Sequence, residues 1–183
     1  MRKLNLLSNF GKRVALVVGL LAATLMGSTS MASAADAPQL VKVPLTLDCA
    51  HMTTKAHDYA VGHGLCTQNG DVTSQGVVSG DCGDSFIWVT NRGGGTANIS
   101  YGFDSSLGTV VYRGLHVSWY NWGTGGASGW DDSGFMFSSS YGTNSNTGTG
   151  AGWVTAGLTG YVELVWGGEC TLLEPTAGGQ ITP

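Results

Sequence analysis

The chain has 183 residues, of which 42% are hydrophobic and 11% charged, and its formal net charge is -4 at pH 7. Aromatic and β-branched residues are plentiful, which excludes an intrinsically disordered chain. All twelve acidic residues follow Ala34, whereas four of the eight Lys and Arg residues precede it. Without its first 34 residues the chain therefore carries eight net negative charges, which argues against nucleic acid and anionic membrane as partners.

Residues 1–34 have the pattern of a secretory signal peptide. Basic residues at positions 2, 3, 12 and 13 precede an apolar run over residues 14–26, and small residues then end in Ala32-Ser33-Ala34. The apolar run is short for a membrane span, although an uncleaved N-terminal anchor is the alternative. We expect a secreted, extracellular bacterial protein with one domain over residues 35–183, a length that can bury a single core.

The first part of the expected domain gives mixed signals. Residues 41–49 place apolar side chains at every second position, but Pro44 lacks a backbone donor, so this strand is expected at a sheet edge or to be irregular. Residues 50–64 show no clean period and indicate a loop or a short helical turn. Asn69-Gly70 is a typical two-residue hairpin turn, so residues 65–68 and 71–78 are expected to pair.

The centre of the chain predicts an antiparallel meander of three strands, over residues 85–90, 96–104 and 109–122. In the second strand, Ile99, Tyr101 and Phe103 share a face that we expect to be buried, opposite a wet face with Asn98, Ser100, Gly102 and Asp104. In the third, Val111, Leu115, Val117 and Trp119 share one face, and Val110, Tyr112, His116 and Tyr120 share the other.

After the meander, residues 123–133 are rich in Gly and Asp. Residues 135–141 alternate as a strand, and residues 142–152 form a polar run that predicts a mobile loop. Further strands are expected over residues 153–155, 158–166 and 169–173. The pattern predicts an all-β fold, a single antiparallel β-sandwich of about seven to nine strands, with a β-barrel as the alternative.

Four cysteines follow the expected cleavage site, and an even number in an exported chain predicts two disulfides. They are Cys49, Cys66, Cys82 and Cys170. Three connectivities are possible. We favour Cys66–Cys82, which closes a short loop, together with Cys49–Cys170, which would join the first strand to the last.

Short motifs around the cysteines carry a resemblance. Asp81-Cys82-Gly83, the turn Gly93–Gly95 and the run Trp166-Gly167-Gly168-Glu169-Cys170 make the chain similar to small secreted actinobacterial β-proteins of no known function. The resemblance implies an extracellular β-protein and no particular activity.

Two groups of residues raise the question of a metal. His51, His57 and His63 lie between Cys49 and Cys66. Histidine and cysteine side chains are common ligands of zinc and copper. Export favours oxidised cysteines, and the spacing of the histidines matches no metal motif, so we interpret the segment as a solvated loop and leave metal binding open.

Asp81, Asp84, Asp131 and Asp132 are possible Ca²⁺ ligands, but they match no twelve-residue calcium loop, and Asp is common in turns. We therefore expect no cofactor.

Aromatic residues concentrate at the end of the meander, beside a Gly-rich stretch that ends in acidic residues. Exposed rings next to polar groups are typical of sugar-binding sites, because ring faces stack on sugars and polar groups bond hydroxyls. The alternative is that the tryptophans fill the core. The predicted ligand-binding residues are Trp119, Tyr120, Trp122, Trp130, Asp131 and Asp132.

The chain lacks the common hydrolase motifs, and no cysteine remains outside the disulfide framework for thiol catalysis. We therefore expect no enzyme but a monomeric extracellular binding protein for a polysaccharide or cell-wall polymer. The alternatives are a protein-directed effector, such as a protease inhibitor or antibacterial toxin, and a hydrolase that uses the histidine loop.

Cleavage is expected after Ala34, because the small-residue motif ends there. N-terminal sequencing of protein recovered from the culture medium should begin at Ala35 or within a residue or two of it. An intact Met1 on the recovered protein would rule out a cleaved signal peptide.

Overall fold

The computed structural model describes residues 41–69 and 82–183, which form nine antiparallel strands and one helix. The strands are β1 (Val41–Leu47), β2 (Gly83–Gly93), β3 (Thr96–Ser105), β4 (Val110–Asn121), β5 (Ala127–Ser138), β6 (Ser140–Gly148), β7 (Gly152–Leu164), β8 (Glu169–Leu172) and β9 (Thr176–Ile181), and the helix is α2 (Thr54–Gly62). The expected signal peptide and the second strand of the expected hairpin, residues 71–78, lie outside the described residues.

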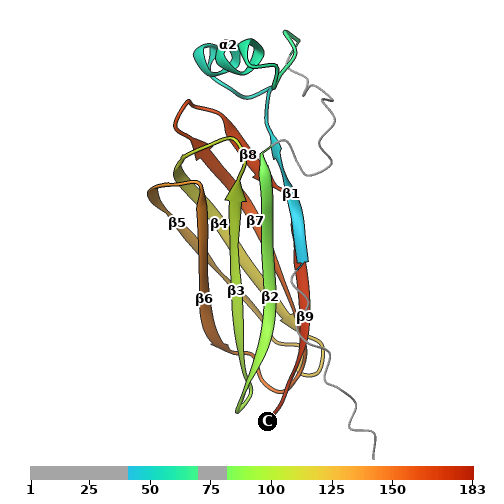
Figure 1. The fold of residues 1–183 in the computed structure, drawn as a ribbon. Helices are drawn as coiled ribbons and strands as arrows, with labels where there is room; N and C mark the ends of the chain where they lie inside the picture. Colours follow the sequence, from blue (N-terminus) through green and yellow to red (C-terminus); the bar gives the residue numbers. More distant parts are fainter. Residues whose placement is uncertain (1–40, 70–81) are drawn as a thin grey trace, which may run out of the picture. The chain divides into compact units, whose positions relative to one another are not determined.

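The strands form one sheet that curls into a nearly closed barrel, in the order β5-β4-β7-β8-β1-β2-β3-β6, with β9 paired to β7 (Figure 1). The all-β prediction is confirmed, and the barrel describes the fold more closely than two separate sheets do. The two ends of this order are β5 and β6, which are consecutive in the chain and joined through Ser139. We call the line along which they face each other the seam.

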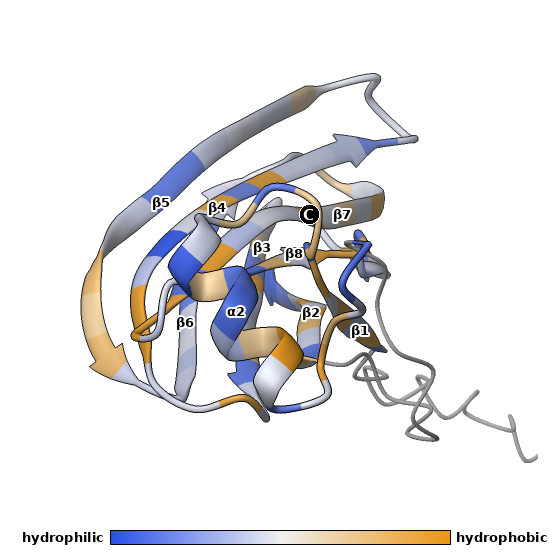
Figure 2. Ribbon diagram, turned by 90° about the horizontal axis from the view of Figure 1, so that it is seen from above, coloured by the Kyte–Doolittle hydropathy of each residue, from blue (hydrophilic) through white to orange (hydrophobic). Residues whose placement is uncertain are grey.

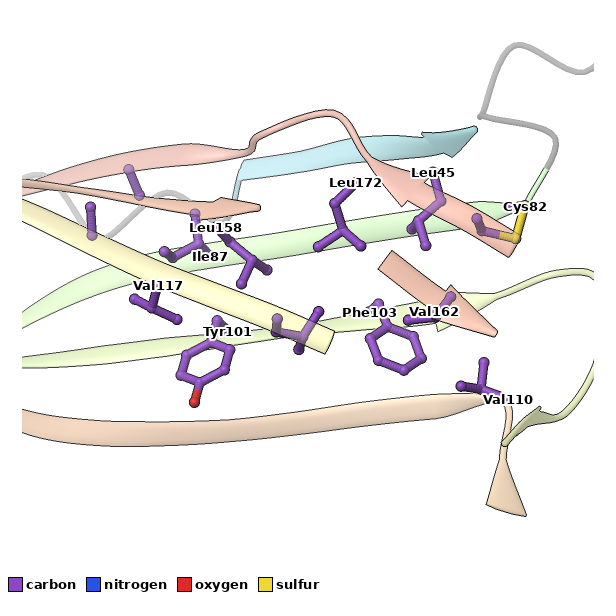
Figure 3. Close-up of a cluster of buried hydrophobic side chains, with 14 of the residues drawn as sticks. Leu45, Cys82, Ile87, Tyr101, Phe103, Val110, Val117, Leu158, Val162 and Leu172 are labelled. Atoms are coloured by element: carbon purple, nitrogen blue, oxygen red, sulfur yellow. A yellow bond between two sulfur atoms is a disulfide. The ribbon is translucent and has the colours of Figure 1, made fainter. Parts of the chain in front are cut away.

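Large apolar side chains on the inward face of the strands form the core (Figure 3). The largest fully buried ones include Phe103, Leu45, Ile87, Leu158 and Val117. Ile99, Tyr101 and Phe103 are buried as predicted, and Leu115 and Val117, which were predicted to share a face, are both buried. Val110 was placed on the wrong face: it is fully buried, because an irregularity in the register between Val110 and Tyr112 breaks the alternation there.

The outward face of β3 is not wet as expected. Asn98 and Ser100 are buried because their neighbours on β2 and β6 cover them. The Asn98 amide donates to the side chains of Asn144 at 2.9 Å and Asn146 at 2.8 Å, and the Ser100 hydroxyl donates to Asn98. These bonds satisfy the buried polar groups, as burial requires.

Two segments for which no strand was predicted are strands, one of them the expected loop. The polar run 142–152 contributes most of β6, which pairs with β3 along its whole length, and the Gly- and Asp-rich run 123–133 contributes the first half of β5. Both strands lie at the ends of the sheet order, where a strand needs no continuous apolar face and polar side chains are common. Low hydrophobicity therefore concealed them.

The strand with Pro44 is not at an edge, because β1 lies between β8 and β2. Pairing with β8 begins only at Leu45, so at Pro44 one side of β1 has no partner strand and the missing N–H breaks no β1–β8 bond. Residues 50–64 hold the helix α2, which begins after Thr53, whose hydroxyl accepts a hydrogen bond from the N–H of Ala56. No helix within the described residues is long and apolar enough to cross a membrane.

Two disulfides are present, but the favoured pairing was wrong: the bonds are Cys49–Cys66 and Cys82–Cys170. Cys170 is on β8 and Cys82 precedes β2, and both of these strands flank β1. Leu47 does oppose Cys170, but Cys49 lies beyond the last paired residue, has left the sheet and joins the segment after α2 instead.

The two bonds are expected to differ in their effect on stability. In the chain-entropy model, the loop of 88 residues closed by Cys82–Cys170 should contribute about 4.5 kcal/mol and the loop of 17 closed by Cys49–Cys66 about 3 kcal/mol. Urea unfolding of the paired serine variants should show this order. Recovery of a peptide linked through Cys66 and Cys82 from the unreduced protein would contradict the pairing.

Candidate functional site

The six predicted ligand-binding residues lie on β4 and β5 or directly after β4, but they divide between the two faces of the sheet. Strand alternation sends Tyr120, Trp122 and Asp131 outward. It turns Trp119, Trp130 and Asp132 toward the interior, where both tryptophans pack against the core. The predicted surface is therefore two separate groups.

The inward group is centred on the carboxylate of Asp132. It accepts hydrogen bonds from the hydroxyls of Tyr141 on β6 at 2.7 Å and Tyr101 on β3 at 3.1 Å, and from Nη2 of Arg113 on β4 at 2.8 Å. The indole N–H of Trp130 donates to the Tyr101 hydroxyl at 3.2 Å. We call these five residues the seam cluster, because they connect β5 to strands with which its backbone does not pair.

Electrostatics in the seam cluster favour a charged Asp132. Burial by itself would raise its pKa, but the hydrogen bonds from Tyr141 and Arg113 and the charge of Arg113 hold the pKa below its ordinary value. Burial, with the nearby carboxylate, raises the pKa of Tyr101 to about 12. The Arg113 guanidinium also lies 4.0 Å from the ring centroid of Tyr141, a cation–π arrangement. Nε of Arg113 is buried without a hydrogen-bond partner, but the Asp132 carboxylate is bonded by three side chains of the cluster. The cluster is therefore suited to holding strands together and offers little to a ligand.

On the outward face, Asp131 pairs with His116 of β4. Nδ1 of His116 lies 2.6 Å from Oδ1 of Asp131, and both side chains are largely exposed. An ionised carboxylate can only accept, so Nδ1 is the donor and Nε2 is left pointing away from the pair. The pair presents a hydrogen-bonding group on an outer surface.

The outward group also contains three exposed rings, those of Tyr120, Trp122 and Trp153, which we call the first aromatic cluster. Their exposed fractions are 39%, 67% and 49%. The rings of Tyr120 and Trp122 meet edge to face at 4.9 Å between centroids. The backbone N–H of Trp122 donates to the backbone carbonyl of Trp153 across the β4–β7 ladder. Exposed aromatic surface of this size on a folded protein is typical of binding sites.

The turn that carries Trp122 is held by hydrogen bonds from the inner side of the sheet. Asn121, fully buried, accepts bonds from the N–H groups of Gly123 and Thr124 and donates to carbonyls of the 149–151 segment. These bonds use the Asn121 amide internally and leave it nothing to offer a ligand. Trp122 is also fixed by a bond from its ring N–H to the Thr155 hydroxyl at 3.2 Å. These bonds hold the turn after β4 and the ring of Trp122 without a ligand.

Gly178 on β9 leaves room for the ring of Trp153. A Cβ at Gly178 would lie 2.7 Å from Cζ2 of Trp153, so only glycine lets this ring rest on the strand. The sequence prediction did not place Trp153 in the site. Alternation along the chain, with Val154 buried and Thr155 outward, could have placed Trp153 on the outer face. That Trp153 lies beside Trp122 depends on the pairing of β4 with β7, which are far apart in the sequence.

A second pair of outward rings is a weaker candidate. Phe86 and Trp88 of β2 stack at 5.5 Å beside the Asn98 amide network. Both are half-buried, and the Asn98 amide that would serve a sugar is already bonded to Asn144 and Asn146. This surface offers less free ring area and fewer free polar groups than the first aromatic cluster.

The residues considered as metal ligands do not converge. His51 pairs with Asp48 at 2.8 Å, His63 stacks on Tyr59, and Cys49 and Cys66 are bonded to each other. Within residues 41–69 and 82–183, no three His, Cys, Asp or Glu side chains are placed to share an ion. Of the proposed calcium ligands, Asp81 lies outside the described residues, and Asp131 and Asp132 point to opposite faces of β5.

Comparison of the chain with protein-family models, with curated proteins and with solved structures finds no match in any of the three.

The seam cluster gives a prediction for stability against pH. Because the pKa of Asp132 is lower in the folded state, its stabilisation is fully present above the ordinary pKa of about 4 and is lost as pH falls through the lowered value. Asp132→Asn leaves Arg113 without a counter-ion and should reduce the free energy of unfolding by about 3 kcal/mol at neutral pH. Urea unfolding between about pH 7 and pH 2 measures both effects.

The matched control is Asp131→Asn, one residue away on the exposed face. It should retain the acid sensitivity of the wild type, whereas Asp132→Asn should lose much of it. Equal acid sensitivity of the two variants would contradict the role assigned to the seam cluster.

Proposed function

We propose that the protein is an extracellular binding protein that recognises a glycan or cell-envelope polymer through exposed aromatic side chains, and that it binds without catalysis. The observation that carries the proposal is the first aromatic cluster, three exposed rings on the outer face of β4 and β7, of which the central Trp122 is held by bonds from its backbone and its ring N–H. Sugars present apolar C–H faces that stack on such rings.

The surroundings of the cluster support this ligand class. Thr155 opposes Tyr120 and accepts the ring N–H of Trp122, and Gln180 of β9 opposes Trp153, so hydroxyl and amide groups border the apolar surface. Few precisely placed polar groups around aromatic surface are the usual composition of a small-molecule or sugar site. The net negative charge favours an uncharged ligand over an anionic one.

The two disulfides are compatible with an oxidising, extracellular compartment, where such a ligand would be met. The expected signal peptide agrees with that location. A protein-directed effector is the alternative, and the same experiment distinguishes it, because an effector would not be retained by polysaccharide.

The test is retention by insoluble cellulose, chitin and peptidoglycan. Trp122→Ala should reduce retention at least about tenfold, because a stacking side chain at the centre of a site commonly contributes more than about 1.4 kcal/mol. The melting temperature should change little, since two-thirds of the ring is exposed.

The matched control is Trp130→Ala, which removes a tryptophan from the seam cluster. That substitution should cost about 3 kcal/mol of stability, while folded protein should still be retained. A wild-type protein that none of the three polymers retains, or a Trp122→Ala variant retained as well as wild type, would refute the proposed site.

A further inference from the structure

A second group of exposed rings lies farther along the same strands. Phe135 and Phe137 on β5 are 84% and 81% exposed, the highest fractions among the large apolar side chains described. Figure 2 shows this end of β5 as a hydrophobic stretch on an otherwise polar strand. Folding gains nothing from rings left in water, so their position calls for another reason.

The two phenylalanines belong to a larger outward patch. Tyr112 of β4 opposes Phe135 and meets it edge to face at 5.3 Å between centroids, and Tyr161 of β7 lies 6.2 Å from Tyr112. Tyr161 lies against Gly114, where a Cβ would be only 2.9 Å from its ring. We call Tyr112, Phe135, Phe137 and Tyr161 the second aromatic cluster.

The two clusters share one face of the sheet. Tyr112 and Tyr120 both belong to β4, and the register with β5 and β7 is unbroken between them. They are separated by an even number of residues, so their side chains leave the strand on the same side. At about 3.4 Å per residue they lie about 27 Å apart along β4.

The surface between the clusters holds no large apolar side chain. The outward positions there are Gly114, His116, Ser118, Gly129, Asp131, Ser133, Gly157 and Thr159. The surface along β4 between the two aromatic clusters therefore consists of small and polar residues. The His116–Asp131 pair stands near its middle, over Gly129, with Nε2 of His116 free to bond a ligand hydroxyl.

Charge restricts the ligand on this face. The outward positions of β4, β5 and β7 include the acids Asp131 and Glu163 and no Lys or Arg, because Arg113 points inward to Asp132. Nothing there would offset the phosphate or carboxylate groups of an anionic polymer.

We propose that the outer face of β4, β5 and β7 binds an extended, uncharged, linear polysaccharide lying along β4. The two aromatic clusters are separate stacking platforms, and His116 and Asp131 bond hydroxyls of the sugars between them. This inference rests on the proposed function and adds to it the shape and the length of the ligand. A chain that reaches both platforms gains affinity from the effective concentration of the second contact, whereas a disaccharide does not.

The experiment compares short and long soluble sugars, cellobiose with cellohexaose and chitobiose with chitohexaose. Binding is followed by tryptophan fluorescence, which reports on the first cluster, since the second contains no tryptophan. Wild-type protein should bind one hexasaccharide at least about tenfold more tightly than its disaccharide. The double variant Tyr112→Ala/Phe135→Ala should bind that hexasaccharide only as tightly as the disaccharide, with disaccharide affinity unchanged. Leu173→Ala, an exposed apolar residue beyond the end of β8, is the control and should behave as wild type.

The outcomes separate the two proposals. Equal affinity for short and long sugars, with no effect of the double variant, overturns the extended site and leaves the first cluster as a binding site. No binding of any sugar, together with no retention by the insoluble polymers, overturns the proposed function and this inference with it. A concentration-dependent dimer in sedimentation velocity that the double variant abolishes would identify the second cluster as a contact between copies and also overturn the extended site.

Discussion

The carboxylate of Asp132 connects β5 to β3 and β6, two strands with which the backbone of β5 does not pair. In a sheet that curls until its ends meet, the last two strands need some link other than the ladder. Here that link consists of hydrogen bonds from the hydroxyls of Tyr101 on β3 and Tyr141 on β6 to one carboxylate, whose charge is paired with Arg113 on β4. Hydrogen bonds to charged groups are among the stronger ones in proteins, which suits them to a place without backbone pairing.

The position of β5 determines which surface the protein displays. With Asp132 turned inward, strand alternation necessarily turns Asp131, Ser133, Phe135 and Phe137 outward, beside the outward residues of β4. The polar seam cluster and the aromatic outer face are thus consequences of one register. A shift of β5 by a single residue would expose Asp132 and bury the phenylalanines, so the register links stability to the proposed binding surface.

Strands with strong alternation of apolar and polar residues could be predicted from the sequence. Elements whose environment is determined by strands far away in the chain could not. The three strands of the meander and their buried residues Ile99, Phe103 and Val117 follow from period-two patterning. The first half of β5 and most of β6 were missed because end strands tolerate Gly, Ser, Thr and Asn. The disulfide pairing failed because the path of the chain after Leu47 depends on the helix at residues 54–62.

The candidate site shows the same division. Clustering of aromatic residues near Trp119–Trp130 indicated β4 and β5, which carry part of the proposed surface, and the alternation rule placed Trp119 and Tyr120 on opposite faces. It could not place Trp153 beside Trp122, nor Phe135 beside Tyr112, because those contacts exist only through the pairing of β4 with β7 and β5. Exposure of Trp130 was misjudged for a related reason: its partner Tyr101 is on β3, far away in the chain.

The central claim is that the outer face of β4, β5 and β7 is the binding face, and the most direct measurement is the position of the six indole N–H signals in an NMR titration with cellohexaose and chitohexaose. The account predicts that the signals of Trp122 and Trp153 move on addition of one of these sugars. Those of Trp119, Trp130 and Trp166, which pack against the core, should stay in place. Movement confined to Trp88, on the far side of the sheet order, or to Trp130 within the seam cluster would contradict the account.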